Sequence, residues 1–421
     1  MTEQKNLKKL VRERMARTGE TYTTARRRVL ARRPGQPGLR HRESRLVAHV
    51  LAQAGYLAPH TGKPYTEAMV CGLGGGIGFL HAVFEYADIP PLITIVMQHH
   101  PEPWLPAVLG KLGIPYTEDR SGKVEAALAA LDQALDGGRA VWCTVDRTQL
   151  PWWEGCLALP QDPHYVVVTG RSGDTFAVLD RGDEPVPIGR AQFAQAWSGH
   201  KKGRHHRVTV TPGTPVDLPA AIRAAIATTV AHLTGPVLGN NFDVNFGFSG
   251  MSRLAASLRD GRTKAGWLHR FAAPNAFAAG LRRLHDCLEV EYTAPGGTRP
   301  LYADYLAEAA GVLDGDATDR LREAAEELRR SGEQWSALAG RAAEASDSLG
   351  ELADLTQQQM AVIITQGPAG RDQILVLGAQ IAALGDRLPG EDERKTLYAE
   401  LAAHVEAAQA LEERAVELLK E

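Results

Sequence analysis

The sequence has 421 residues, 44 % hydrophobic residues and a net charge of −3 at pH 7, an ordinary composition for a globular protein of two or three domains. This charge balance argues against a nucleic acid as the partner of the whole protein. No run of eighteen apolar residues occurs, so we expect no transmembrane helix, and the opening MTEQKNLKKL lacks the apolar core of a signal peptide.

The four cysteines are widely spaced and form no C-x-x-C pair; they are Cys71, Cys143, Cys156 and Cys287. This spacing predicts free thiols in a reducing cytoplasm, without a disulfide framework or a zinc ribbon. We expect no bound metal and no cofactor. The basic loop at residues 199–206, GHKKGRHH, has no acid or cysteine at ligand spacing, so we predict a solvated or phosphate-facing loop, one candidate partner being the acidic surface of a carrier protein.

Residues 1–37 form a basic extension that ends in a Pro/Gly linker. The first 35 residues hold eleven Lys and Arg against three Asp and Glu. Such a stretch can contact a nucleic acid or an acidic partner, or it can be a solvated pair of short helices. We favour the second interpretation, because the stretch is too short to build its own core.

The main domain begins with GLRHRES, and apolar spacing predicts a helix from residue 41 to residue 54. His41, Arg42 and Glu43 therefore lie near the positive end of this helix.

A glycine-rich stretch, residues 64–79 with the sequence PYTEAMVCGLGGGIGF, follows. Apolar spacing predicts a short helix, a glycine loop and a second helix over residues 79–87. The glycines match neither G-x-G-x-x-G nor a loop ending in G-K-[ST], which argues against a phosphate cradle. A substrate wall and tight packing both remain open, and we predict that Gly74, Gly75 and Gly76 line a substrate or an oxyanion site.

Strands and helices then alternate up to residue 210. Strands are predicted at 92–97, 114–116, 140–145, 164–169, 176–180 and 208–210, and helices at 104–112, 123–135 and 193–197. Trp152 and Trp153 fall in the loop after the strand at 140–145.

His164 opens one strand of a predicted hairpin, and Asp180 ends the other. A hairpin of this length can bring the two side chains together. A histidine oriented by an acid is the second half of a Cys/His/Asp arrangement. The first half would be a cysteine at a helix N-terminus, where the helix dipole lowers the thiol pKa.

Residues 218–421 are predicted to be mainly helical, which is typical of a bundle between domains or in a homodimer. Two loops interrupt the helices. One is polar and aromatic, at residues 239–248, and is of a kind that can close over a cleft; the other is rich in Gly and Pro and ends in Arg299.

The region from about residue 38 to residue 210 resembles the N-terminal domain of butirosin-biosynthesis protein H, a branch of the papain-like, C39-like cysteine peptidase fold. The motifs GLRHRES, EAMVCGLGGGIGF, HYVVVTG and FAVLD carry this resemblance. From about residue 218, NFGFSGMSRLAASL and YTAPGGTRPLYADYLAEAA are similar to the helical domain that usually follows. The resemblance implies an α+β fold, with a papain-like domain at residues 38–212 and a helical domain at residues 213–421. It also implies acyl transfer from a carrier-protein thioester, through an enzyme cysteine, to an amine.

The sequence departs from the family pattern at the nucleophile. The pattern places His-Cys at the start of the first helix, where this chain has His41-Arg42. Losing a triad nucleophile typically costs on the order of a millionfold in rate. The protein could be non-catalytic, Cys71 could replace the nucleophile, or His164 could be a general base while Arg42 holds an anionic substrate. Ser44 is a further candidate, but it would point away from the position of residue 42.

We expect an acyl- or aminoacyl-transfer enzyme of natural-product biosynthesis, with a pseudoenzyme that binds or scaffolds, or a small amide or thioester hydrolase, as alternatives. His164 is predicted to be the acid/base, Asp180 its orienting acid and Cys71 the replacement nucleophile. The residues expected to contact substrate are His41, Arg42, Glu43, Gly74, Gly75, Gly76 and Arg299.

Overall fold

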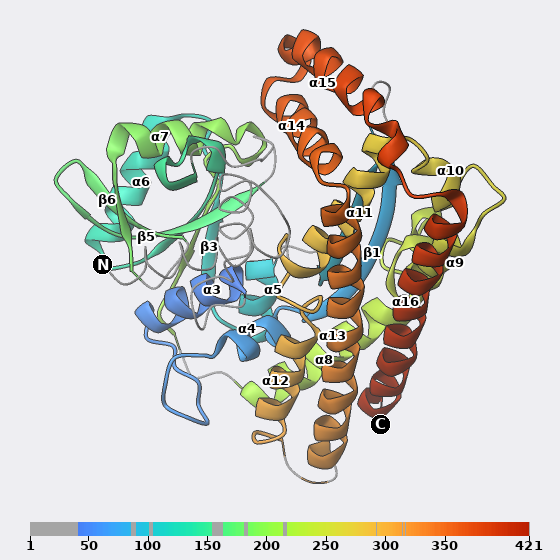
Figure 1. The fold of residues 1–421 in the computed structure, drawn as a ribbon. Helices are drawn as coiled ribbons and strands as arrows, with labels where there is room; N and C mark the ends of the chain where they lie inside the picture. Colours follow the sequence, from blue (N-terminus) through green and yellow to red (C-terminus); the bar gives the residue numbers. More distant parts are fainter. Residues whose placement is uncertain are drawn as a thin grey trace, which may run out of the picture. The chain divides into compact units, whose positions relative to one another are not determined.

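The computed structural model describes residues 41–85, 90–100, 104–153, 163–180, 184–213, 217–291, 293–313, 315 and 317–420. The basic extension at residues 1–37 and Cys156 lie outside the described residues. The residues from 41 onward belong to one unit, whose elements are labelled in Figure 1.

A six-stranded antiparallel sheet has the order β3-β8-β4-β5-β6-β7. Its strands are β3 (Tyr116–Asp119), β4 (Val141–Val145), β5 (His164–Ser172), β6 (Thr175–Leu179), β7 (Val186–Gly189) and β8 (Arg207–Val210). The strand predicted at 114–116 therefore lies two residues further along, and the predicted hairpin is β5-β6. β4, buried along its whole length, lies between β8 and β5.

Helices cover the two faces of this sheet. One face packs on α6 (Val124–Asp136) and α7 (Arg190–Gly199), in a core that contains Val166, Val168 and Trp197. The other face, through Trp142 and Val167, joins a core that extends to α3 (Arg42–Gln53) and α4 (Glu67–Leu73). This alternation of buried side chains is what the pleat of a strand imposes.

A separate two-stranded sheet pairs β1 (Ile77–Phe84) with β2 (Leu92–Gln98). The predicted helix over residues 79–87 is therefore wrong. The first six residues of β1 are all buried, and apart from Gly78 and His81 they are apolar. Such a run fits helical spacing as well as it fits a strand.

The remaining described helices are α5 (Trp104–Lys111), α8 (Leu218–Thr234), α9 (Gly247–Arg259), α10 (Trp267–Arg270), α11 (Pro274–Glu289), α12 (Arg299–Ala309), α13 (Ala317–Ser348), α14 (Glu351–Gln366), α15 (Arg371–Ala383) and α16 (Glu391–Lys420). Short 3-10 turns are η1 (Arg147–Gln149), η2 (Pro151–Trp153), η3 (Lys201–Gly203), η4 (Asn241–Asn245), η5 (Gly367–Gly370) and η6 (Gly385–Arg387). The chain is thus mixed α/β in its first half and helical in its second.

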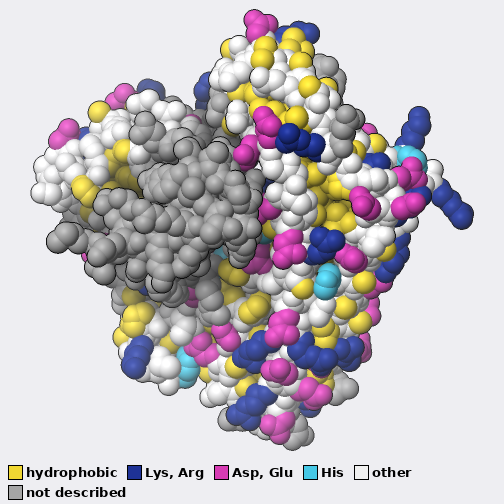
Figure 2. All heavy atoms as spheres, in the orientation of Figure 1, with side chains coloured by type: hydrophobic (Ala, Val, Ile, Leu, Met, Phe, Trp, Pro, Cys, Tyr) yellow, Lys and Arg dark blue, Asp and Glu magenta, His cyan; other side chains and the backbone are white. Residues whose placement is uncertain are grey.

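The long helix α13 packs against α11, α12 and α16, and α9 packs on both α16 and β1 (Figure 1). One continuous core runs from α3 and α4 through the β1-β2 sheet into these helices. Among the described helices, none combines the length and apolar character needed to cross a bilayer. On the face drawn in Figure 2, Lys and Arg are interspersed with Asp and Glu over the helical region.

Candidate functional site

The N-terminus of α3 is fixed by His41, which caps the helix. Its Nδ1 accepts a hydrogen bond from the Ser44 backbone N–H and lies 2.6 Å from Ser44 Oγ. Nε2 lies 2.8 Å from Gln98 Oε1, at the end of β2. The imidazole is 2 % exposed and meets the Trp104 ring edge-on. His41 thus caps and anchors the helix, which argues against the prediction that it contacts substrate.

Arg42, the first residue of α3, is held by three oxygen acceptors. Nη1 donates to the Tyr165 carbonyl at 2.6 Å and to Asp180 Oδ1 at 2.9 Å, and Nη2 donates to Glu43 Oε1 at 2.6 Å. Burial alone would lower the pKa of Arg42, but Glu43 and Asp180 outweigh it and raise that pKa. The side chain is charged, 20 % exposed, and bound to two carboxylates of its own chain, which argues against the prediction that it holds an anionic substrate.

His164 and Asp180 form the contact expected from the hairpin. His164 Nε2 lies 3.0 Å from Asp180 Oδ1, and both side chains are buried. The other oxygen of the carboxylate, Oδ2, accepts hydrogen bonds from two indoles, Trp152 Nε1 at 2.6 Å and Trp153 Nε1 at 2.7 Å. The predicted proximity is confirmed, whereas the catalytic roles of the two residues stay predictions.

We call these connected side chains the His164 group: Arg42, Glu43, Trp152, Trp153, His164 and Asp180. The protonation states of its members follow from their contacts. Burial would raise the pKa of Asp180, but hydrogen bonds and charges from His164, Arg42 and Trp152 lower it below its ordinary range. Burial, helped by the Arg42 charge, lowers the pKa of His164 against the opposing effects of Asp180 and Glu43. At pH 7 the imidazole is therefore neutral. Since the ionised carboxylate only accepts, Nε2 carries the proton and Nδ1 the lone pair.

Sequence reasoning missed the residues that saturate Asp180. The adjacent Trp152 and Trp153 were recognised as a loop, but not as donors. Their signal was a pair of indoles directly after a buried strand, each carrying an N–H that needs an acceptor when buried. The Tyr165 carbonyl and Gln98 amide left no signal in the sequence, because their roles depend on long-range register.

Cys71 does not lie among the residues that act on His164. It is 1 % exposed within α4, where its charge would act on Tyr302 and Tyr305 of α12. The charged groups that shift the pKa of His164 most are Arg42, Asp180 and Glu43. Cys71 belongs to the hydrophobic core, which argues against its predicted role as nucleophile.

The other described nucleophiles are buried too. Burial raises the pKa of Cys143, and it raises the pKa of Cys287 to about 11. Ser44 is fully buried beside His41. Within the described ranges, His164 hydrogen bonds to Asp180 and to no thiol or hydroxyl group.

The glycine loop is covered by aromatic rings. A Cβ on Gly74 would overlap the Trp104 indole, a Cβ on Gly75 would lie 2.6 Å from the His99 ring, and a Cβ on Gly76 would overlap the Tyr302 ring. All three glycines are buried. Close packing therefore explains why these positions are glycine, and it argues against the predicted substrate wall.

Arg299 lies in the core of the helical region. Its Nε and Nη2 each donate to the Glu412 carboxylate at 2.8 Å, and Nη1 donates to the carbonyls of Met97 and Gly297. Both side chains are 0 % exposed, and Glu412 also accepts from Ser331 Oγ and Trp335 Nε1. These donors already serve buried acceptors of the chain, which argues against the prediction that Arg299 binds substrate.

The histidines of the basic loop also have internal partners. His205 lies 2.7 Å from the Ser121 carbonyl and 3.0 Å from Ser198 Oγ. His206 contacts Glu118 and Thr144. Both histidines are therefore bound within the chain instead of being freely solvated, whereas contact of the loop with a phosphate or a carrier protein stays a prediction. No group of three or more His, Cys, Asp or Glu among the described residues could hold a metal ion.

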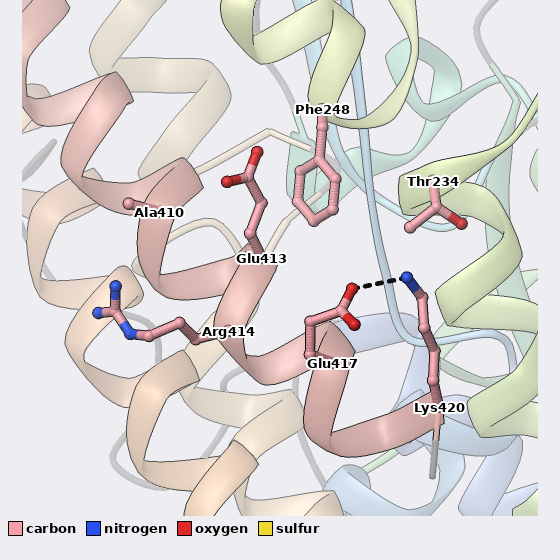
Figure 3. Close-up of a pocket in the computed structure, with 7 residues that line it drawn as sticks. All are labelled: Thr234, Phe248, Ala410, Glu413, Arg414, Glu417 and Lys420. Atoms are coloured by element: carbon pink, nitrogen blue, oxygen red, sulfur yellow. Dashed lines mark hydrogen bonds and ion pairs between the residues drawn. The ribbon is translucent and has the colours of Figure 1, made fainter.

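A separate surface hollow of about 520 Å³ lies between α8, α9 and α16. Figure 3 shows its lining, which consists of Thr234, Phe248, Ala410, Glu413, Arg414, Glu417 and Lys420. Lys420 pairs with Glu417 at 2.7 Å, and Arg414 pairs with Glu327. Its cations are thus neutralised by the chain, and the hollow shares no residue with the His164 group.

Two family models match successive parts of the chain. Residues 41–181 match the model described as "Butirosin biosynthesis protein H, N-terminal", and residues 188–366 match "Domain of unknown function (DUF4872)". The chain belongs to the butirosin biosynthesis protein H-like two-domain family. No curated protein matches it. In this family member, the first match contains every residue of the His164 group, and the second contains Arg299.

Proposed function

We propose that this member of the butirosin biosynthesis protein H-like family transfers an acyl group from a thioester to an amine during natural-product biosynthesis. The observation that carries the proposal is the His164–Asp180 pair beside the N-terminus of α3. A papain-like domain would use this geometry, because it places an oriented imidazole beside the start of a helix. The thioester would be free or bound to a carrier protein.

The charges of the site support an amine as the acceptor. Glu43 and Asp180 are ionised and Arg42 is charged, while His164 is neutral. Two carboxylates against one guanidinium leave one net negative charge in a largely buried group. An ammonium group approaching Glu43, whose side chain is 17 % exposed, would be attracted by this charge. The lone pair on His164 Nδ1 could then accept the proton of the amine.

A second candidate function is a binding or scaffold protein without catalysis. It is favoured by Arg42, which stands where the family pattern has cysteine and is paired with Asp180. A guanidinium held in this way cannot take up an acyl group as a thiol does. Arg42 also weakens the imidazole as a base, since its charge lowers the pKa of His164.

The experiment is incubation of the full chain with acetyl- and hexanoyl-pantetheine, with and without ethylenediamine, followed by mass spectrometry of the amide and a thiol-release assay. We expect an amide product that His164→Ala reduces by at least about a hundredfold. His60→Ala, a change at a histidine that contacts Glu308 instead, should leave the rate unchanged.

The other outcomes separate the alternatives. Thiol release that is independent of the amine and yields free acid would identify a hydrolase. Absence of both amide and thiol release, with saturable thioester binding measured by calorimetry, would leave the binding protein and overturn acyl transfer.

A further inference from the structure

Helix α15 has apolar side chains on two opposite sides. Leu377 and Ile381 are buried, and the helix packs on α14 and α11. The opposite side carries exposed residues that we call the outer face of α15: Leu375, Val376, Ala379, Ala382 and Ala383. A helix that is apolar all round is typical of an element buried on all sides. The exposure of the outer face therefore indicates a surface that binds a partner.

The outer face includes some of the most exposed large hydrophobic side chains among the described residues. Leu375 is 62 % exposed and Val376 is 58 % exposed. Figure 1 shows α14 and α15 as a hairpin that projects from the helical region, and Figure 2 shows hydrophobic side chains over this hairpin. A contiguous apolar patch on the surface of a globular protein marks an interaction site.

Charge is confined to the two ends of the outer face. Residues 373–385 include no charged side chain. Asp372 lies at the N-terminal end, three residues before Leu375 and thus on the same side of the helix. Arg387, which is 53 % exposed, follows the C-terminal end in η6. An acidic partner would meet no cation along this face, whereas an uncharged face of the same length would fit it.

The side chains of the outer face change in size along the helix. The bulky Leu375 and Val376 lie in the N-terminal half, and the three alanines follow them. Two copies packed antiparallel would place the bulky half of each against the small half of the other. Parallel packing would place bulky against bulky and leave the alanines apart. Antiparallel packing also brings Asp372 of each copy towards Arg387 of the other and opposes the two helix dipoles favourably.

We propose that the outer face of α15 binds the same face of a second copy of this chain, antiparallel, with a two-fold axis near Ala379. Such an isologous contact is closed, so it forms a dimer and not a filament. The small side chains at the axis let the helix axes approach to about 8 Å.

The size of the contact sets the strength of the dimer. A helix of 13 residues is about 20 Å long, and one face of it is smaller than a standard protein–protein interface. We therefore expect a reversible dimer that forms at micromolar concentrations. This dimer does not depend on the proposed acyl transfer.

Sedimentation velocity of the full chain, from low to high micromolar concentration, tests the proposal. The sedimentation coefficient should rise from that of a monomer to that of a dimer. Leu375→Glu buries an unpaired carboxylate in each half of the contact and should raise the Kd by at least about a hundredfold. Val290→Glu makes the same kind of change at a side chain 60 % exposed after α11 and should leave the Kd unchanged. Circular dichroism checks that both variants are folded.

Cysteine cross-linking tests the antiparallel arrangement. The native cysteines among the described residues are buried. Ala379→Cys lies near the axis and should give a disulfide-linked dimer under mild oxidation, which the added change Leu375→Glu should suppress. Arg371→Cys lies eight residues from the axis, so its two copies would be about 24 Å apart along the helix, too far for a disulfide. Equal cross-linking of both cysteines would indicate parallel helices and contradict the proposal.

A wild-type chain that stays monomeric over the whole concentration range would overturn the inference, as would a dimer whose Kd is unchanged by Leu375→Glu. A monomer that binds a carrier protein, and loses this binding in Leu375→Glu, would assign the face to that partner and also overturn it. The outcome for acyl transfer is separate. Amide formation by a monomeric wild-type chain would leave the proposed function standing, whereas a dimer without amide formation would leave the interface standing.

Discussion

Arg42 Nη1 lies 2.9 Å from Asp180 Oδ1, the same oxygen that His164 Nε2 contacts at 3.0 Å. The guanidinium and the imidazole thus share one acceptor, and the positive charge lies beside the ring that would have to become positive during acid–base catalysis. Asp180 stabilises Arg42 at the same time as it orients His164. The chemistry available to His164 therefore depends on residue 42.

Replacement of Arg42 by methionine should raise the pKa of His164. The guanidinium lowers this pKa in the native protein, whereas methionine keeps much of the side-chain length without the charge. We expect a rise of about one unit, measured by NMR titration of the imidazole protons. Arg45→Met, a matched change one position beyond Ser44, should leave the titration unchanged. An unchanged His164 pKa in the Arg42 variant would show that its charge does not reach the ring.

Glu43→Gln should flatten the loss of stability in acid. Burial would raise the pKa of Glu43, but Arg42 and His41 outweigh it and lower that pKa from 4.5 to about 2. A depressed folded-state pKa contributes stability that is present above the unfolded-state value near 4.5 and is lost as the pH falls through about 2. The contribution is up to about 3 kcal/mol.

Urea unfolding at several pH values between 5 and 2 measures this effect. Glu326→Gln, at a side chain that is 65 % exposed, is the control and should follow the wild-type curve. The prediction fails if the Glu43 variant loses stability with acid as steeply as the wild type does.

Breaking the Arg299–Glu412 pair should be strongly destabilising. Removing one partner leaves an uncompensated charge in a site with no exposure, which costs roughly 3–5 kcal/mol. Glu412→Gln and Arg299→Met should therefore lower the free energy of unfolding by this amount. The double variant Arg299→Met with Glu412→Leu should recover part of the loss, since it removes both charges.

The surface pair Arg259–Glu406 provides the comparison, with side chains 44 and 50 % exposed. Arg259→Met should cost only about 0–1 kcal/mol. Equal losses in the buried and the exposed pair would contradict this account.

Gly76→Ala should destabilise the protein by about 2–5 kcal/mol. Gly76 has φ +64°, a conformation that costs a non-glycine residue about 1–2 kcal/mol, and its Cβ would also overlap the Tyr302 ring, adding about 1–3 kcal/mol of overpacking. Gly173→Ala isolates the first effect, because Gly173 has φ +56° and no heavy atom within 4 Å of its Cβ position. Denaturant unfolding measures the loss of unfolding free energy in both variants. Equal losses would show that overlap with the Tyr302 ring does not contribute.

The sequence predicted the elements whose signal is local. The β5-β6 hairpin followed from two β-rich runs around Gly173, and its geometry brings His164 to Asp180. The helical character of the second half was also predicted, and long helices such as α13 and α16 confirm it. In both cases neighbouring residues are sufficient to determine the structure.

The errors concern positions whose surroundings come from distant parts of the chain. The glycine loop looked open because nothing near it in sequence shows that Trp104, His99 and Tyr302 cover it. Arg299 looked available for the same reason, since Glu412 lies 113 residues away. Arg42 was recognised as a departure from the family pattern, but its bond to Asp180 required the fold.

Strand β2 carries a consequence for how genes of this family can recombine. Met97 accepts from Arg299, which lies in the second matched region, and the next residue, Gln98, contacts His41 at the start of α3. Glu412, which holds Arg299, lies beyond both matched regions. A chimeric gene that joins the first half of one family member to the second half of another would encode a protein in which β2 comes from one parent. The arginine that donates to its Met97 carbonyl would come from the other parent. We therefore expect the two regions and the C-terminal helix to diversify as one unit.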